Sequence, residues 1–187
     1  MKWYCPEQEA QRLASEQQTL AREKLELRQM VATAVHLATL SRIFYDIWWY
    51  YEGSATRPVV LDKLNSHSEF FRFDSHAHFV SFIVHLAALF GDRSDTINIS
   101  SLVADSQDQA VLTDEESAEA NAKLDSLTST IKGVSILRSN LFAHRSDKLT
   151  YEEVFKKASL TPDKLRGLSL AAFEILTMLS EKFKLTP

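Results

Sequence analysis

The sequence predicts an all-α fold, in its simplest form a four-helix bundle with additional short helices and a long N-terminal helical segment. Glycine and proline number four each among 187 residues, too few for a β architecture rich in turns. The segment 7–51 contains neither and is rich in residues that favour helices. Two further helix starts are marked by capping boxes, in which Thr113 precedes Glu116 and Thr150 precedes Glu153.

The composition is that of a soluble globular protein, with 45% hydrophobic and 25% charged residues. The length suits one helical domain over residues 1–187. Cys5 is the only cysteine, so neither an intrachain disulfide nor a thiolate metal cluster can form, which fits a reducing compartment. The first residues lack an apolar signal core, and the longest apolar run, 79–90, is too short to span a bilayer. We therefore expect a cytoplasmic protein without membrane association.

The N-terminal segment 7–51 is either one extended helix or two helices joined end to end. Pro6 suits its first turn, where the missing N–H costs nothing. The first half is charged and carries Leu13, Leu20 and Leu27 at a spacing of seven, which favours a pairing seam with another helix. The second half is apolar around most of its circumference and should enter the core.

The remaining bundle helices are expected within 73–183, after a connecting loop over 53–71 that contains a glycine, a proline and several polar residues. Asp74 or Ser75 should cap a helix that Gly91 terminates. The later expected elements are a short helix near Ser101, a long helix from Thr113 to about Arg145, a short helix after Thr150 and a last helix from Pro162 to about Phe183.

Charge is distributed unevenly along a chain whose net charge is −4. Residues 101–130 contain seven acidic side chains and one basic side chain, whereas residues 131–166 contain eight basic and four acidic ones. The first segment therefore carries −6 and the second +4. The overall charge argues against a general nucleic-acid coat, but a local positive field can still attract a polyanion.

A phosphate-handling site is suggested by Arg138 and His144, at the end of the expected long helix. A guanidinium offers planar, permanent donors to phosphate oxygens, and an imidazole exchanges protons near neutral pH. Together they suffice for cleavage of RNA by its own 2′-hydroxyl. That reaction needs a base, an acid and a clamp on the phosphate, but no metal or other cofactor.

The spacing of these residues leaves two arrangements open. At about 100° per residue, Arg138 and His144 lie about 120° apart around an α-helix, whereas Asn140, His144 and Asp147 share a stripe. Arg138 can reach the same ligand by bending its side chain, or a two-fold partner can bring a second copy of the stripe alongside. Ser139 or Asn140 would then orient the imidazole or the phosphate.

The segment "LRSNLFAHRSD" resembles the motif of the HEPN superfamily (higher eukaryote and prokaryote nucleotide-binding), an arginine followed after about four to six residues by a histidine. The upstream "EFFRFDSHAHFVSFIVHLAALFGDRSDTINISSL" is similar to the abortive-infection U-type, or AbiU-like, branch, in which a helix ending in Leu-Phe-Gly/Asp-Asp precedes a short serine-leucine segment. The resemblance covers residues 40–180 in order and spacing.

What this resemblance implies is a helical bundle, a homodimer through the motif helices and, in many members, a metal-independent endoribonuclease. Such proteins act on RNA in phage defence or in toxin–antitoxin pairs, so an antitoxin or another defence protein is an implied partner. Carried over by position, Arg138 would be the phosphate clamp and His144 the acid/base residue.

Two alternatives to catalysis stay open at the motif. Active members place Asn, Asp or His directly after the arginine, and here that residue is Ser139, which leaves room for a catalytically inactive module that binds RNA, a nucleotide or a protein. The second alternative is purely structural: Arg138 and Arg145 satisfy the last carbonyls of their helix while His144 caps it.

Control by modification is a separate matter. Members silenced by a nucleotidyltransferase carry a tyrosine where this chain has Ser146, which argues against that control.

Two other clusters of residues are candidates for a functional site. Asp74, His78 and His85, at spacings of four and seven, could line one helical face as metal ligands, whereas His76 is expected near a helix start. No Glu-x-x-His pair occurs in the chain, so we expect partly buried or interfacial histidines and no metal. The segment 42–53 carries six aromatic residues between Phe44 and Tyr51, which could stack on RNA bases, but filling a core or an interface is the favoured role. Within that segment, an ion pair between Arg42 and Asp46 is expected.

Overall fold

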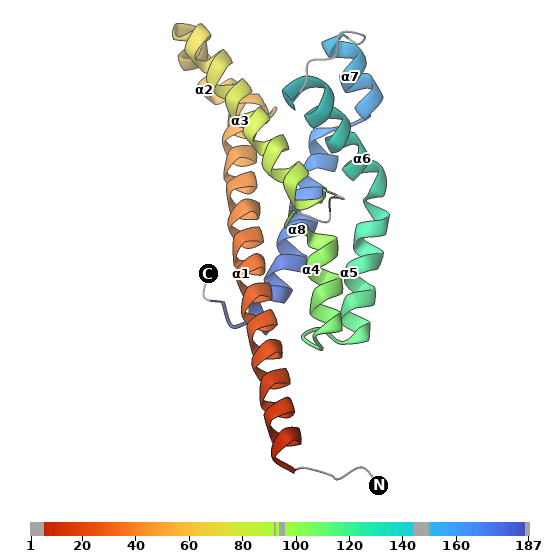
Figure 1. Cartoon of the computed structure of the whole chain (residues 1–187). Helices are drawn as coiled ribbons and strands as arrows, with labels where there is room; N and C mark the ends of the chain where they lie inside the picture. Colours follow the sequence, from red (N-terminus) through yellow and green to blue (C-terminus); the bar gives the residue numbers. More distant parts are fainter. Residues whose placement is uncertain (1–5, 92, 94–95, 144–149, 186–187) are drawn as a thin grey trace.

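The computed structural model describes residues 6–91, 93, 96–143 and 150–185. These residues form eight α-helices and one π-helical segment, with no strand among them, which confirms the predicted all-α class. In chain order the elements are α1 (Pro6–Glu52), α2 (Arg57–Ser66), α3 (Ser68–Leu89), α4 (Ile99–Asp108), α5 (Asp114–Ser126), α6 (Thr128–Leu137), η1 (Arg138–Ala143), α7 (Tyr151–Ala158) and α8 (Pro162–Lys182). Figure 1 shows α1, α3, α8 and the α5–α6 pair side by side as the body of the bundle.

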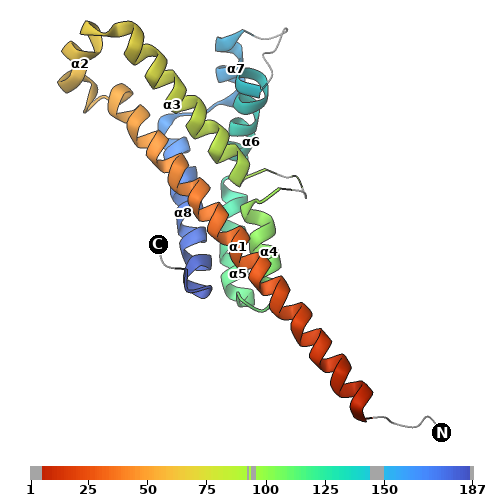
Figure 2. The same cartoon turned by 60° about the vertical axis from the view of Figure 1, so that its left-hand side comes forward.

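The N-terminal helical segment is a single helix, α1, and not two helices joined end to end. Its N-terminal part projects beyond the bundle, while its C-terminal part packs along α3 and α8 (Figures 1 and 2). Of the three leucines at a spacing of seven, Leu27 is fully buried and Leu20 is 47% exposed, whereas the Leu13 side chain lies outside the described residues. The proposed pairing seam along this repeat stays a prediction.

Two clusters of buried side chains hold the helices together. One joins α1, α4, α5 and α8 through residues such as Leu27, Ile99 and Leu176. The other joins α1, α3, α6, α7 and α8, and Phe82 and Leu137 are fully buried within it. Each such side chain stabilises the fold by about 1.5–3 kcal/mol when it leaves water. The second cluster lies directly beneath the motif that begins at Arg138.

The connecting loop expected over 53–71 is wrong, because α2 occupies 57–66 and α3 already begins at Ser68. Pro58 lies in the first turn of α2, where a proline needs no hydrogen-bonded N–H, so it starts a helix instead of breaking one. Ser75 is therefore not a cap. It lies inside α3, and its hydroxyl donates a hydrogen bond of 3.0 Å to the Glu52 carboxylate of α1.

The continuous helix expected from Thr113 to about Arg145 is also wrong, since α5 ends at Ser126 and α6 begins at Thr128. The Ser126 hydroxyl donates to the carbonyl of Lys123 at 2.7 Å, and the Thr128 hydroxyl donates to the carbonyl of Asp125 at 2.8 Å. Hydroxyls that bond back to nearby carbonyls compete with the helical hydrogen-bond ladder, which accounts for a break at this point.

Both predicted capping boxes are confirmed. Thr113 and Glu116 exchange side-chain and backbone hydrogen bonds at the start of α5, and Thr150 and Glu153 do so at the start of α7. The short helix near Ser101 is α4, whose Asn98 side chain accepts a hydrogen bond of 2.9 Å from the Ser101 N–H. None of the described helices carries an apolar stretch long enough to cross a bilayer.

Candidate functional site

The motif begins where α6 passes into the π-helical segment η1, and buried and exposed residues alternate sharply there. Val134 and Leu137 are 1% and 0% exposed and anchor α6 in the second core cluster. Arg138 and Ser139, the next two residues, are exposed. Burial of the aliphatic side chains thus fixes the rotation of the helix and places the arginine at the surface.

The change from α-helix to π-helix coincides with one side-chain hydrogen bond. The Asn140 amide donates to the main-chain carbonyl of Ile136 at 2.9 Å. In an α-helix this carbonyl would accept from the backbone N–H of Asn140 itself, whereas π-helical turns pair each carbonyl with the fifth residue along. The side chain of Asn140 thus supplies a donor to a carbonyl at the point where the regular pairing changes.

Three of the six predicted site residues can be placed. Arg138 and Ser139 are exposed and Asn140 is half-buried on η1, whereas His144, Arg145 and Asp147 lie outside the described residues. The angle of about 120° between Arg138 and His144 assumed α-helical geometry, and the structure departs from that geometry from Arg138 onward. That an arginine and a histidine share one cleft stays a prediction.

Arg138 has no partner within the described residues that would give it the structural role of satisfying the last carbonyls of its helix. Among residues 6–91, 93, 96–143 and 150–185, no carbonyl oxygen accepts a hydrogen bond from its guanidinium and no carboxylate forms an ion pair with it. The nearby lysine of α8 behaves differently, because the Lys164 ammonium donates to the carbonyl of Ser159 at 2.8 Å. Within the described part of the chain, no side chain or carbonyl thus competes with a ligand for the Arg138 guanidinium.

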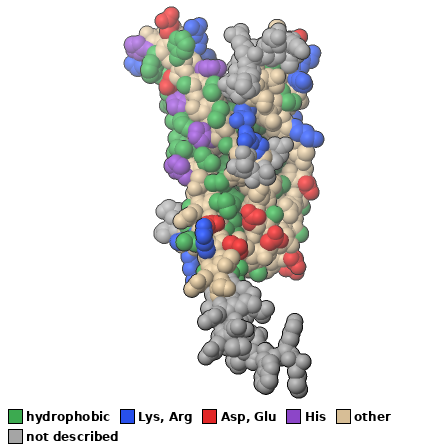
Figure 3. Space-filling model, viewed as in Figure 1, with side chains coloured by type: hydrophobic (Ala, Val, Ile, Leu, Met, Phe, Trp, Pro, Cys, Tyr) green, Lys and Arg blue, Asp and Glu red, His purple; other side chains and the backbone are tan. Residues whose placement is uncertain are grey.

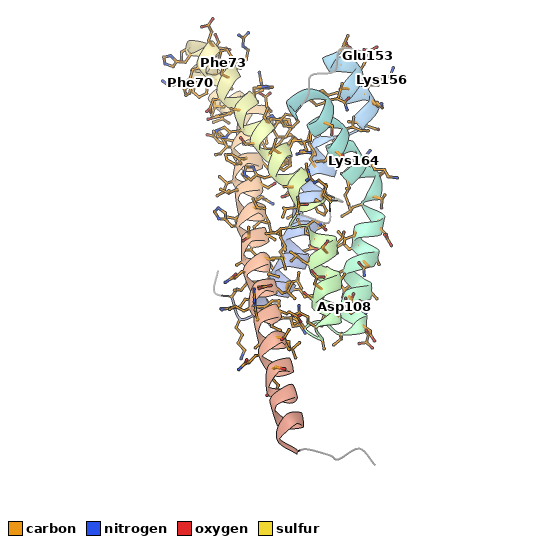
Figure 4. All side chains as sticks on the ribbon, viewed as in Figure 1. Phe70, Phe73, Asp108, Glu153, Lys156 and Lys164 are labelled. Carbon is orange, nitrogen blue, oxygen red and sulfur yellow. The ribbon has the colours of Figure 1, made fainter. Side chains whose placement is uncertain are left out.

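Helix α7 returns the chain to α6 directly after the motif. The N–H and the hydroxyl of Thr150 donate to the Glu153 carboxylate at 2.7 and 2.9 Å. Both hydrogen bonds hold the pKa of Glu153 below its usual value, and the one from the Thr150 N–H has the larger effect. Figure 4 shows Glu153 and Lys156 at the same end of the bundle as η1, so the box fixes where the chain re-enters the fold.

A glycine allows α7 to approach α6 closely. A Cβ added at Gly133 would lie 2.5 Å from the main-chain oxygen of Ala158 and 2.9 Å from the Leu160 side chain. Sequence reasoning missed this contact, although a glycine in the interior of a helix is a recognised signal of close packing. Gly133 lies five residues before Arg138, so the contact braces the helix that carries the motif.

The unequal charge along the sequence becomes a separation in space. Helices α4 and α5, which carry the acidic segment, lie at one end of the bundle, and α6 and α7 lie at the other (Figure 1). Figure 3 shows acidic side chains over the lower right of the visible face and Lys and Arg side chains over its upper part. The motif therefore lies at the more basic end.

Two histidines of α3 contact the same aromatic ring. The rings of His78 and His85 lie 5.7 and 5.4 Å from that of Phe44 on α1, in tilted arrangements. His78 also lies 3.4 Å from the Asp74 carboxylate. Within the described part of the chain, no group of three or more His, Cys, Asp or Glu side chains is placed to hold a metal ion.

The aromatic run on α1 is largely part of the core, as favoured. Tyr45 is 2% exposed and stacks edge-on against Phe82, and the Trp48 ring lies 4.9 Å from that of Phe79. Burial raises the pKa of the Tyr45 hydroxyl. The expected pair on the same helix is confirmed: the Arg42 guanidinium lies 2.9 Å from the Asp46 carboxylate.

The site thus combines a helical bundle with an arginine and a histidine six residues apart in the sequence, starting where α6 gives way to η1. The model of the AbiU2 family of HEPN domains matches residues 24–184, most of the chain, and the chain belongs to this family. This confirms the resemblance to the abortive-infection U-type branch. No curated protein and no solved structure gives a significant match to the chain.

Proposed function

We propose that this abortive-infection HEPN domain is a metal-independent endoribonuclease that acts in phage defence or in a toxin–antitoxin pair. The observation that carries the proposal is the state of Arg138: in an AbiU2-family chain it is exposed, at the start of η1, and uncommitted to any described carboxylate or carbonyl. A guanidinium in this state suits a phosphate that arrives with the substrate.

The proposed reaction is attack of an RNA 2′-hydroxyl on the adjacent phosphorus. The new bond joins O2′ to phosphorus and the bond from phosphorus to O5′ breaks, leaving a 2′,3′-cyclic phosphate and a 5′-hydroxyl. His144 would exchange the proton of the attacking or the leaving oxygen, and Arg138 would stabilise the charge on the crowded phosphate. Neither role requires a metal ion.

The basic end of the bundle supports an RNA substrate over a neutral one. Residues 131–166 carry a net charge of +4 within a chain of −4, and α6 and α7 place part of this charge around η1. Such a field concentrates a polyanion locally without making the whole protein adhere to nucleic acid. A homodimer through the motif helices and an antitoxin partner belong to the same proposal.

A second candidate is a catalytically inactive HEPN module that binds RNA, a nucleotide or a protein partner. Two observations favour it: Ser139 stands where active members carry Asn, Asp or His, and the next amide is committed, since Asn140 donates to the Ile136 carbonyl. Ser139 and Asn140 can still contact a ligand. Neither of them directly replaces the Asn, Asp or His that active members carry after the arginine.

The test is cleavage of single-stranded RNA in EDTA by micromolar purified protein. The wild type should leave cyclic-phosphate ends, and His144→Ala and Arg138→Ala should each lower the rate by about 100-fold or more. His67→Ala and Arg22→Ala are matched controls, because both side chains are exposed and lie away from α6 and η1. These two variants should cleave as the wild type does.

The second candidate predicts a different pattern. The wild type would bind RNA in a mobility-shift assay without cleaving it, and Arg138→Ala would weaken that binding. Cleavage that survives in His144→Ala would contradict the nuclease proposal, because it would point to a contaminating enzyme or to another acid/base residue.

A further inference from the structure

The proposed cleavage needs two proton transfers, and the motif contains a single histidine, His144. One group must take the proton of the 2′-hydroxyl, and another must give a proton to the departing O5′. The attacking and leaving oxygens lie on opposite sides of the phosphorus in an in-line displacement, so one imidazole serves only one of them. A second proton-transfer group is therefore to be sought among the residues that surround η1.

His76 lies on the side of α3 that turns away from α1. At about 100° per residue, His78 and His85 lie about 160° and 180° from it around the helix. Those two histidines contact Phe44 of α1, as described above. His76 is also more than two turns inside α3, which begins at Ser68, and not near a helix start as expected. Of the three histidines of α3, it alone is turned away from the contact with Phe44.

The side of α3 that carries His76 faces α6 and η1. The Phe79 ring lies 4.9 Å from that of Trp48 on α1 and 6.1 Å from that of Phe155 on α7. Ile83 follows around the helix, further from α1, and is fully buried in the core cluster that includes residues of α6 and α7. His76 lies about 20° beyond Ile83. Because α3 packs against both α6 and η1, this is the side that meets the motif helix.

His76 is exposed where this packed side of α3 ends. Ile83 is buried and Ala87 and Val80 are half-buried, whereas His76 is exposed. At about 1.5 Å of rise per residue, it lies about 4–5 Å along the helix axis from Phe79, the residue that meets α7. Figure 1 shows the first half of α3 and helix α7 at the same end of the bundle. The imidazole is thus accessible at the edge of the surface on which η1 packs.

Arg72 adds a permanent positive charge beside this imidazole. It lies four residues before His76, about 40° away around α3, and is exposed. Its guanidinium carbon lies 5.5 Å from the centre of the Phe73 ring, and no carboxylate in the described part of the chain forms an ion pair with it. Glu69, an acid on this side of the helix, is two turns earlier than His76, roughly 10 Å along the axis. With Arg138 on η1, Arg72 makes these surroundings suitable for a chain of phosphates.

We propose that His76 is the second proton-transfer group of the nuclease and acts on an RNA whose phosphate Arg138 binds. The inference rests on the proposed function and deepens it. One imidazole takes the proton of O2′ as the bond from O2′ to phosphorus forms. The other gives a proton to O5′ as the bond from phosphorus to O5′ breaks, and water then restores both imidazoles to their starting protonation states. His76 would therefore contact the substrate directly.

The first experiment compares cleavage of single-stranded RNA in EDTA by the wild type, His76→Ala and His78→Ala. His76→Ala should lower the rate by about 100-fold or more, the usual contribution of a positioned acid or base. Its affinity for an uncleavable 2′-deoxy analogue should stay close to that of the wild type. His78→Ala is the matched control, because it removes a histidine from the same helix on the side that faces Phe44, and it should cleave as the wild type does. Thermal melting checks that all three proteins are folded.

Free imidazole distinguishes a proton-transfer role of His76 from a structural one. The substitution His76→Ala leaves room at an exposed position, so imidazole in the buffer should raise the rate of this variant by about tenfold or more. It should not raise the rate of Arg138→Ala, which lacks a charge and not a proton carrier. A His76→Ala variant that cleaves as the wild type does, or a slow one that imidazole does not rescue, would overturn the inference and leave the proposed nuclease intact. A wild type that does not cleave RNA would overturn both.

Discussion

The side-chain amide of Asn140 and the main-chain carbonyl of Ile136 are joined by a hydrogen bond of 2.9 Å where α6 becomes π-helical. π-Helical turns are rare and concentrate at functional sites. Here the turn starts at Arg138, the first residue of the motif. The hydrogen bond therefore links the local helix geometry to the surface position of the proposed phosphate clamp.

This relationship predicts the effect of Asn140→Asp, which removes the donor and places a carboxylate against a carbonyl oxygen. The free energy of unfolding should fall by about 1 kcal/mol or more, because a half-buried acceptor loses its partner. Urea unfolding measures the loss. Asn121→Asp is the control: Asn121 is exposed and its amide makes only a 3.5 Å contact with Ser117, so its change should stay within about 0.5 kcal/mol.

Two glycines of helical segments should respond in opposite directions to the same substitution. Gly133→Ala brings a Cβ to 2.5 Å from the Ala158 carbonyl and should destabilise the fold by about 1–3 kcal/mol, because α6 and α7 must separate. Gly167→Ala meets nothing within 4 Å and should stabilise α8 by about 0.5–1 kcal/mol, since alanine is the better helix former. Denaturant unfolding of both variants gives the two signs.

A neutral or stabilising Gly133→Ala would mean that α7 shifts without cost, and the proposed brace of the motif helix would be abandoned. A destabilising Gly167→Ala would instead show that this position is occupied by a neighbour in solution.

Much of this architecture was predictable, since it follows from local rules. Thr113 and Thr150 each have a glutamate three residues later, a pattern that predicts the start of a helix, and both capping boxes are present in the structure. These local rules gave the wrong element where a residue type is compatible both with a helix and with a break in one. Pro58 lies in a segment expected to be a loop and instead opens α2. The hydroxyls of Ser126 and Thr128 lie inside the helix expected from Thr113 to about Arg145, and they bond to carbonyls where that helix breaks.

The motif illustrates a different limit. Its residue types and order identify the HEPN family without any coordinates, as the AbiU2 match bears out. The angular relation of Arg138 to later residues was not predictable, because it depends on how many residues make each turn. A helical wheel drawn at α-helical geometry cannot anticipate η1, and nothing in the pattern shows that Asn140 serves the Ile136 carbonyl.

Substitution of the two capping threonines, Thr113 and Thr150, can distinguish an effect on stability from an effect on RNA cleavage. Thr150→Ala and Thr113→Ala should each lower the free energy of unfolding by about 1 kcal/mol, because each removes the acceptor for an N–H in the first helical turn. Only Thr150→Ala should also lower RNA cleavage, since α7 starts just after the motif while α5 starts in the distant acidic part. Equal cleavage by both variants would argue that the start of α7 does not position the motif.

Acid should weaken the fold partly through Glu116 and Glu153. A hydrogen bond from Lys182 to Glu116, followed by one from the Thr113 N–H, lowers the pKa of Glu116, and the Thr150 N–H lowers the pKa of Glu153. Because both folded-state pKa values lie below those of the unfolded chain, the stabilisation is complete above the ordinary glutamate pKa. It is lost as the pH falls through the folded-state values.

Urea unfolding across the acidic range measures this dependence. The double variant Glu116→Gln with Glu153→Gln should be less stable than the wild type at neutral pH and should approach it in acid, so its profile should be flatter. Glu119→Gln is the control, because Glu119 is an exposed acid of the same helix as Glu116, and its profile should follow the wild type. A double variant with the full wild-type slope would show that other carboxylates govern the acid response.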